Sequence, residues 1–166
     1  ADGTASEGRS AEVKIDAFHD FEKSRIVGEF IFRGDKKDNG RRITEARQAY
    51  FRSPFAGFDF FVGNRQEFWG KAESKNVVDV INQSDAAANE GKSGKLGAPS
   101  ISAERYLDIG DLQLWYISSF REKTFNDSDA HPSSGVPVNS AQYARKDGRD
   151  ADDFAARLSS FAGDLS

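Results

Sequence analysis

Three short groups of residues have the types and spacing that could support chemistry, and the first is Gly91-Lys92-Ser93. It has the ending of a phosphate-binding loop. Such a loop needs a further glycine five residues before Gly91, because its cradle for phosphate is made of backbone N–H groups. Ala86 holds that position. The favoured interpretation of this group is therefore an exposed loop, not a nucleotide site.

The second group is Asp127, Asp129 and His131, whose alternating spacing suits a hard cation such as calcium. The central glycine and distal glutamate of the hand-like calcium loop are missing. The third group comprises the two histidines, His19 and His131. A catalytic histidine needs a nucleophile and an orienting acid beside it, and no motif here supplies them. We therefore predict no catalytic residue, no metal, no cofactor and no enzymatic activity; a surface-attached hydrolase is a remote alternative.

A fourth pattern extends along the chain. Arginine and glutamate recur in segments where polar and apolar residues alternate as they do in strands, and the neighbouring positions are apolar or aromatic. One interpretation is a charged channel lining that screens solutes by charge and size. The other is the wet face of an ordinary antiparallel sheet. The candidate lumen-lining residues are Glu45, Arg47, Arg65, Glu67, Glu104, Arg121 and Arg157.

The elements that would position these charges are strands. In the segment that begins at Phe58, apolar Phe58, Phe60 and Val62 alternate with Asp59 and Arg65, as expected when successive side chains point to opposite faces. Alternation of this kind predicts about seven strands. Their expected ranges are 13–21, 25–33, 41–52, 58–69, 100–109, 112–124 and 153–162.

Composition agrees with an all-β fold. The 166 residues include 14 Phe, while only 37% are hydrophobic, and aromatic residues favour strands. A net charge of −4 gives no basis for nucleic-acid binding. No apolar run reaches the ~18 residues of a spanning helix. A membrane form of this chain would therefore cross with strands.

The connections between the expected strands alternate in length. Short turns are expected at 22–24, 54–57, 110–111 and 163–164, and longer loops at 34–40, 70–98 and 126–152. Short turns on one rim and long loops on the other are typical of outer-membrane barrels. The predicted organisation is a flexible lead-in over 1–11 and a partial barrel over 12–166. A short helix is expected within 73–85, with Ser74 as N-cap and an apolar stripe from Val77 to Ile81.

A longer motif string resembles an uncharacterised family of Gram-negative outer-membrane β-barrel proteins, which are porin-like. The resemblance rests on Phe68-Trp69-Gly70, Glu73-Ser74, Val78-Asp79-Val80-Ile81-Asn82-Gln83-Ser84-Asp85, Lys95-Leu96-Gly97-Ala98-Pro99, Gly110-Asp111-Leu112-Gln113-Leu114 and Phe120-Arg121-Glu122-Lys123-Thr124-Phe125. It implies that the chain is the N-terminal half of a longer barrel. It also marks a motif loop formed by Phe68, Trp69, Gly70, Glu73, Ser74, Asp79, Asn82, Gln83 and Asp85, with a structural role before a functional one.

The sequence therefore predicts an antiparallel up-and-down meander that forms part of a transmembrane β-barrel in the bacterial outer membrane. Its role would be porin-like or export-related. Its partners would be outer-membrane lipid and the remaining strands of its own barrel, and not nucleic acid. The alternative is a soluble antiparallel β domain that binds carbohydrate or a partner protein through aromatic residues, with Trp69, Trp115, Tyr50 and Tyr106 as the stacking platform.

Overall fold

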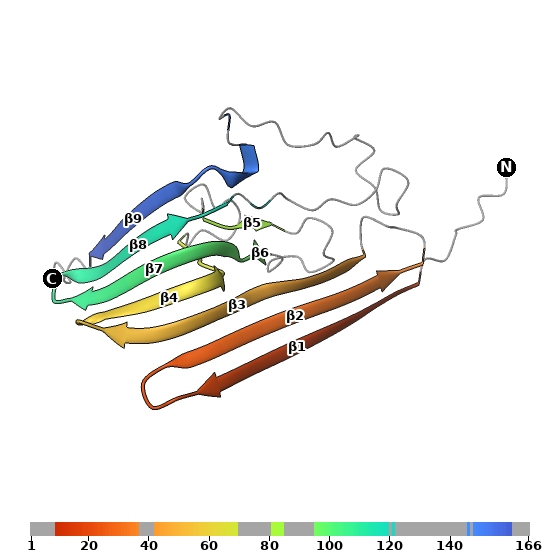
Figure 1. The fold of residues 1–166 in the computed structure, drawn as a ribbon, viewed down its shortest axis with the longest axis horizontal. Coiled ribbons are helices and arrows are strands. Elements are labelled where there is room, and N and C mark those ends of the chain that lie inside the picture. The colour runs from red at the N-terminus through yellow and green to blue at the C-terminus, as the bar shows by residue number, and fades with distance from the viewer. Residues whose placement is uncertain are drawn as a thin grey trace, which may run out of the picture.

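The computed structural model describes residues 9–36, 42–69, 81–84, 95–119, 121, 146 and 148–160. Seven strands form one antiparallel sheet in the order β1-β2-β3-β4-β7-β8-β9 (Figure 1). They are β1 (Ser10–Asp20), β2 (Arg25–Asp35), β3 (Ile43–Phe55), β4 (Phe58–Arg65), β7 (Ala98–Leu107), β8 (Gly110–Ile117) and β9 (Asp153–Ser160). Two short strands, β5 (Gln83–Ser84) and β6 (Lys95–Leu96), pair separately, and a 3₁₀ turn, η1, covers Gly148–Asp150.

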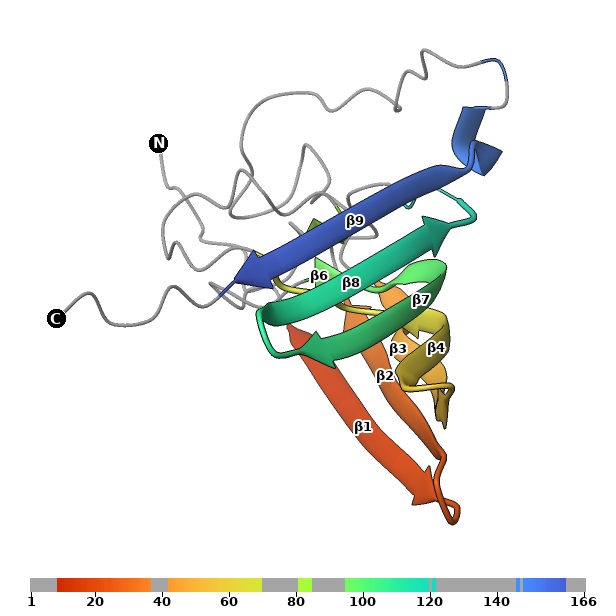
Figure 2. The same cartoon turned by 90° about the vertical axis from the view of Figure 1, so that its left-hand side faces the viewer.

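The sheet is an up-and-down meander, as the alternation in the sequence predicts. Each of its strands pairs with the next one along the chain, apart from the β5–β6 insertion between β4 and β7. In the described residues β1 and β9 are unpaired edges, so the sheet is not closed. Figure 2 shows its twist: β1 and β9 lie at a steep angle to each other. That twist follows from the handedness of L-residues in strands.

Short and long connections fall at opposite ends of the sheet. Residues 21–24, 56–57 and 108–109 make the short turns. Ala56 and Gly57 both have positive φ, 50° and 79°, which is the backbone that lets a two-residue hairpin follow the strand twist. The long connections, at 36–42, 66–97 and 118–152, lie at the other end. The alternation of loop lengths expected from the sequence is confirmed for these six connections, whereas the short turn expected at 163–164 lies outside the described residues.

Several expected boundaries are wrong. The turn after β7 is at 108–109, because Gly110 already belongs to β8 and pairs with Leu107. The strand expected to run to Trp69 ends at Arg65. Conversely, β3 extends through Pro54 to Phe55. β1 begins at Ser10, inside the range expected for the flexible lead-in.

The helix expected within 73–85 is absent from residues 81–84, the part of that range that the structure describes. Gln83–Ser84 is a strand that pairs with Lys95–Leu96, and the side chain of Asn82 bonds to backbone groups on other segments. Residues 73–80 and Asp85 lie outside the described residues. The long loop expected over 70–98 is also wrong at its C-terminal end, because Leu96 and Ala98 are buried there. Figures 1 and 2 place β5 and β6 beside the long-connection ends of β7 and β8.

Candidate functional site: a polar inner face and an apolar outer face

The two faces of the sheet differ sharply, and the strand register defines them. Residues directly opposite one another on neighbouring strands share a face. One register row crosses all seven strands and holds only large side chains: His19, Ile26, Phe51, Val62, Ile101, Tyr116 and Phe154. We call the face that carries this row the apolar face. The opposite side, which carries Arg65, Glu104 and Trp115, we call the polar face.

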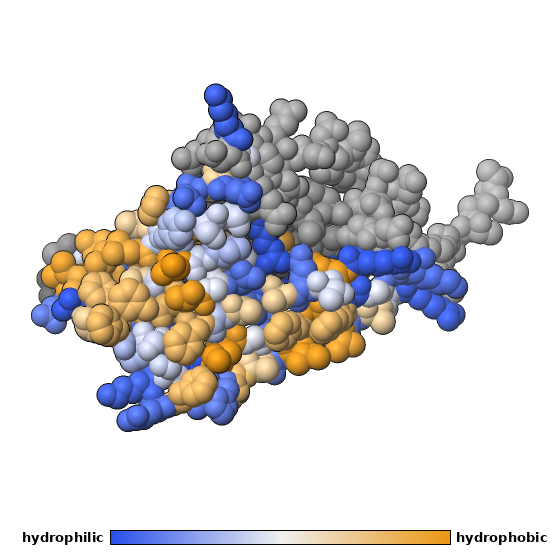
Figure 3. Space-filling model, viewed as in Figure 1, coloured by the Kyte–Doolittle hydropathy of each residue, from blue (hydrophilic) through white to orange (hydrophobic). Residues whose placement is uncertain are grey.

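Large apolar residues are exposed on the apolar face, whereas charged residues are buried on the polar face beside apolar ones such as Ile31 and Phe61. On the apolar face, Val13 is 56%, Leu158 57% and Phe154 80% exposed. On the polar face, Arg47 is 2% and Arg33 6% exposed. Charged residues are seldom fully buried, and large apolar residues seldom gather on an open surface. Figure 3 shows hydrophobic side chains over the strands and hydrophilic ones at both ends of the β1–β2 hairpin.

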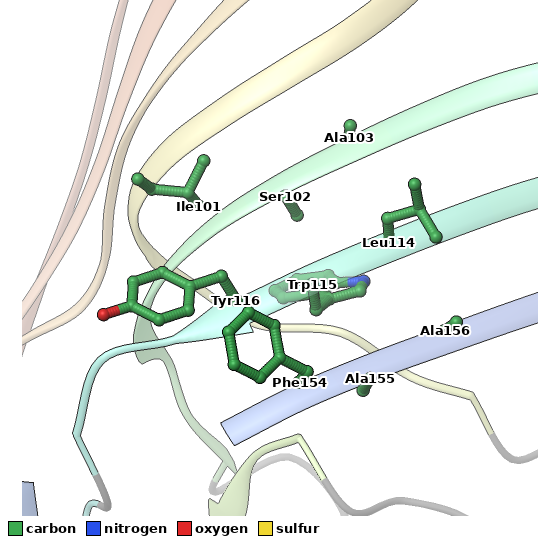
Figure 4. A pocket seen from close by; sticks show the side chains of 9 residues that line it. All are labelled: Ile101, Ser102, Ala103, Leu114, Trp115, Tyr116, Phe154, Ala155 and Ala156. Carbon is green, nitrogen blue, oxygen red and sulfur yellow. The ribbon is translucent and has the colours of Figure 1, made fainter. Parts of the chain in front are cut away.

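The apolar face carries two shallow grooves, each between a row of large side chains and a row of smaller ones. The first, of about 490 Å³, lies between the Ile101–Tyr116–Phe154 row and the Ala103–Leu114–Ala156 row (Figure 4). The rings of Tyr116 and Phe154 lie 5.2 Å apart there. The second, of about 480 Å³, has Ala17, Gly28 and Ala49 in one register row at its base. Both grooves are open and mostly apolar.

The polar face is tied together by cross-strand pairs. Glu12 on β1 accepts from Arg33 on β2 at 2.6 Å. Lys14 lies 3.0 Å from Glu29, which also accepts from Gln48 on β3. Further along the same face, Arg52 on β3 donates to both carboxylate oxygens of Asp59 on β4, at 2.9 and 3.0 Å. Polar contacts therefore join β1 to β4 strand by strand.

Arg65 is the centre of a cluster of charged residues on this face. Its guanidinium donates to Glu104 at 2.5 Å, Glu67 at 3.0 Å and Ser102 at 3.2 Å, and it lies 3.7 Å from the ring centroid of Phe61. Glu104 also accepts from Gln113 on β8. A planar guanidinium with several donors suits such a site better than an ammonium does.

The structure thus brings together some of the candidate lumen residues but not all of them. Arg65, Glu67 and Glu104 form one cluster, and Glu45 pairs with Arg121 in a second. Arg47 is buried on β3 beside the bulge between β2 and β3. Arg157 is opposite Gln113 in the register of β8 and β9. Sequence reasoning missed Arg33, Arg52 and Asp59. Asp59 has the same parity as Arg65 on β4, whereas Arg52 shares a face with Glu45 only because the bulge between β2 and β3 shifts the alternation along β3.

The second cluster lies where β4 leaves the sheet. β4 ends at Arg65, and beyond it Gly97 occupies the position next to β3, donating its N–H to the carbonyl of Arg47 at 2.9 Å. A β-carbon at Gly97 would lie 2.5 Å from that carbonyl oxygen, so only glycine fits. Arg121 spans this junction: it donates to the carbonyls of Gly97 and Ala46 and pairs with Glu45.

Where the structure describes it, the chain between β4 and β7 folds over the polar face. We call its described residues, 66–69, 81–84 and 95–97, the inner segment. Ile81 packs with Trp115, Ile117 and Ala98, and Trp69 packs against this cluster. Since Trp115 belongs to the polar face, the inner segment covers that face at its long-connection end.

Asn82 and Lys95 hold the inner segment in place. Asn82 is buried, accepts from the N–H of Glu67 at 2.5 Å and donates to the carbonyls of Arg65 and Leu96. Lys95 donates to the carbonyl of Glu67 at 3.2 Å and lies 4.0 Å from the ring centroid of Phe68. Burial lowers the pKa of the Lys95 ammonium, while Glu67 opposes that shift.

Of the expected motif loop, Phe68, Trp69, Asn82 and Gln83 are in the described residues. Gly70, Glu73, Ser74, Asp79 and Asp85 are outside them, as are Gly91-Lys92-Ser93 and the Asp127–His131 group. Among the described residues there is no cluster of three metal-ligating side chains. His19 has the ring of Phe21 4.8 Å away.

The aromatic residues of the alternative hypothesis are not gathered into one platform. Trp115 is buried, and Trp69 packs against its cluster. Tyr50 contacts Phe61, whereas Tyr106 is exposed near the short-turn end of β7. Within the described ranges no ring contact joins two of these four residues.

Comparison with known proteins gives no neighbour: no family model, curated protein or solved structure matches the chain significantly. The resemblance to an outer-membrane family therefore stays a prediction. No helix in the described ranges is long and apolar enough to cross a membrane.

Proposed function

We propose that this chain forms part of the wall of an outer-membrane β-barrel with a porin-like or export-related role. The single observation that carries the proposal is the exposed apolar face, opposite a face that carries the charged clusters. Exposed Val13, Phe154 and Leu158 would contact lipid, and the face of Arg33 and Arg47 would line the interior of the barrel. A transmembrane barrel has this distribution because its outer surface is solvated by lipid and its lumen by water.

Strand length supports the proposal. β1 and β2 have 11 residues each, which corresponds to about 36 Å of extended chain. At a tilt of 35–45° such a strand rises about 25–30 Å, which matches the ~25 Å apolar band of outer-membrane barrels. β4, β8 and β9, with 8 residues each, span less.

The short-turn rim has the character of a lipid–water boundary. Phe21, in the turn after β1, and Phe55, on the apolar face of β3, are more than half exposed there. Arg105 on the same face of β7 lies 5.2 Å from the ring of Phe58. Aromatic girdles with nearby cations are typical of both edges of the apolar band.

Closing the wall would require further strands. With seven alternating strands, β1 and β9 run in the same direction. An entirely antiparallel barrel has an even number of strands, so an odd number more would have to join the two edges. The remainder of the same barrel is the proposed source of these strands.

The test is expression from the complete gene. We expect the protein in the outer-membrane fraction, a shift in gel mobility between heated and unheated samples, and ion conductance in a planar lipid bilayer. A folded monomer that is stable in plain buffer without detergent would contradict the proposal. That result would favour the soluble β domain that binds carbohydrate or a protein partner.

A further inference from the structure

The two open edges of the sheet, β1 and β9, differ in how their charges are paired (Figure 1). All charged residues of β1 have ion-pair partners within the β1–β2 hairpin; they are Glu12, Lys14, Asp16 and Asp20. Within Ser10–Asp20 no charge is therefore left without a partner. The β1 edge can meet a neighbouring strand through its backbone, but its charges do not require one.

Arg157 on the β9 edge is in the opposite state. It lies partly buried on the polar face, opposite Gln113 of β8. Gln113 instead donates to Glu104 at 3.1 Å, and its own buried Oε1 accepts no hydrogen bond. Asp111, the next residue of β8 on this face, lies opposite Ser159. Where the structure describes the chain, neither Asp111 nor any other residue forms a hydrogen bond or ion pair with Arg157.

This lack of a partner interrupts a pattern that runs across the sheet. From β1 to β8, polar side chains on the polar face bridge each pair of neighbouring strands; the bridges include Glu12–Arg33, Glu29–Gln48, Arg52–Asp59, Arg65–Glu104 and Glu104–Gln113. One register row reaches the β9 edge through Asp59, Glu104, Gln113 and Arg157. The row thus runs from carboxylates to an amide and ends in a cation. Continuing the pattern requires a carboxylate beyond Arg157.

The backbone and the apolar side of β9 also favour an added strand. Every second residue of an edge strand turns its N–H and C=O away from its one neighbour, and such groups can pair with another strand. On the apolar face, Phe154 of β9 is 80% exposed, whereas Leu114 of β8 is 42% exposed. Ala156, a small residue on the same face, lines the first groove. An added strand would cover both residues with its own apolar side chains.

We propose that the β9 edge binds an antiparallel β-strand that presents an aspartate or glutamate to Arg157. Backbone hydrogen bonds would hold the strand, and the carboxylate would fix its register. A slip by one residue would turn the carboxylate to the apolar face and leave Arg157 unpaired again. The strand belongs to the remainder of the proposed barrel wall. That source rests on the proposed function, whereas the need for a carboxylate follows from the charges of this sheet.

Photo-cross-linking from β9 tests the proposal in the protein expressed from the complete gene. A diazirine amino acid in place of Ser159, which shares the polar face with Arg157, would capture the neighbouring strand on irradiation. Mass spectrometry of the digested product would identify the captured residue. We expect a cross-link within one polypeptide, to a segment beyond residues 1–166. That segment should carry an acidic residue on the same face within about four positions of the captured one.

Charge reversal separates recognition by Arg157 from backbone pairing alone. Arg157→Glu should lower the cross-linking yield about tenfold, because like charges then oppose each other across the two strands. Arg157→Lys should keep most of the yield. A lysine in place of the captured strand's acidic residue should restore the yield in the Arg157→Glu background. Lys23→Glu makes the same change of net charge at an exposed position between β1 and β2, and should leave the yield unchanged.

The outcomes separate this inference from the barrel function. A captured strand without an acidic residue, or a yield that Arg157→Glu does not change, would overturn the inference. A cross-link to a second copy of the chain, or to a residue within 1–166, would overturn it as well. The expected cross-link and charge dependence in a protein that neither enters membranes nor conducts ions would overturn the barrel function and leave the recognition of an acidic strand standing.

Discussion

At the scale of single residues, Gly110 is the position where the sheet most strictly requires glycine. Its φ is +140°, and a β-carbon there would lie 1.7 Å from the carbonyl oxygen of Ser159 on β9. Backbone strain and the clash act together, so Gly110→Ala should lower the free energy of unfolding by more than about 2 kcal/mol. Urea unfolding of the protein folded in detergent would measure this change.

Gly34 provides the matched control for that substitution. It also lies in a strand of the main sheet, but a β-carbon there has nothing within 4 Å. Gly34→Ala should stay within about 0.5 kcal/mol of the wild type. Equal effects at Gly34 and Gly110 would mean that β8 and β9 do not approach each other as described.

Arg65 supports a second prediction at this scale. Its side chain is 13% exposed and binds two carboxylates. Arg65→Gln would leave Glu67 and Glu104 close together without their cation, and should cost about 3 kcal/mol of unfolding free energy. Arg25→Gln removes a pair with Asp20 in which both side chains are about half exposed, and should have a much smaller effect because water screens this pair. Equal losses in urea unfolding would contradict the assigned burial.

Lys95 gives a prediction about pH. Burial lowers its pKa below the ordinary value of 10.5 in the folded state, so the folded protein binds fewer protons than the unfolded chain just below pH 10.5. Stability attributable to Lys95 should therefore rise with pH in that window. The measurement is the unfolding free energy of wild type minus that of Lys95→Met, from pH 8 to 10.5. A difference that falls with pH would contradict the assigned desolvation.

At the scale of elements, Asn82 determines whether the inner segment stays on the polar face. Asn82→Ala would leave the N–H of Glu67 and the carbonyls of Arg65 and Leu96 without this partner. Asn82→Asp would keep the acceptor and turn a carboxylate towards two carbonyls. Each variant should destabilise the segment by about 2–4 kcal/mol, detected as faster proteolysis within 66–97.

Gln48→Ala is the control for Asn82. Gln48 makes one part-buried hydrogen bond, to Glu29 at 3.2 Å, and its removal should cost no more than about 1.5 kcal/mol. It should leave proteolysis within 66–97 unchanged. Cleavage at the wild-type rate in both Asn82 variants would show that the side chain does not hold the segment.

The strands themselves could be predicted from the sequence because alternation is a local property. The faces of 25–33 and of the strand that begins at Phe58 are assigned correctly, since a period of two needs no knowledge of partners. The ends of elements depend on distant groups. Gln83–Ser84 forms a strand only because Lys95–Leu96 lies beside it, and an apolar stripe alone predicted a helix there.

The candidate site also combines features that local alternation predicts with features that depend on distant parts of the chain. Arg65 and Glu104 were both predicted to line the lumen, and they pair across neighbouring strands, although their register partners are Ala98 and Asp59. No local pattern joins Glu45 to Arg121, because β4 must first leave the sheet and Gly97 must take its place beside β3. The junction where β4 leaves the sheet was therefore beyond prediction from sequence alone.

At the scale of the whole molecule, the choice between membrane wall and soluble domain depends on what surrounds the apolar face. Val62 lies in the register row that crosses all seven strands, and it is 50% exposed. Phe55 lies at the short-turn rim and is 73% exposed. In water, arginine at either exposed position would change stability by about 0.5 kcal/mol or less. In lipid, the cost depends on depth in the bilayer.

Val62→Arg and Phe55→Arg together therefore test whether lipid or water surrounds the apolar face. If lipid covers the face, Val62→Arg should cost about 2–4 kcal/mol and Phe55→Arg about 0–1 kcal/mol, as arginine does at the midplane and the interface of a bilayer. Urea titration of folding into vesicles would measure both. A large difference between the two stability costs would require apolar surroundings at Val62 and water at Phe55. Near-equal, small effects would mean that water surrounds both residues, and the membrane wall would be excluded.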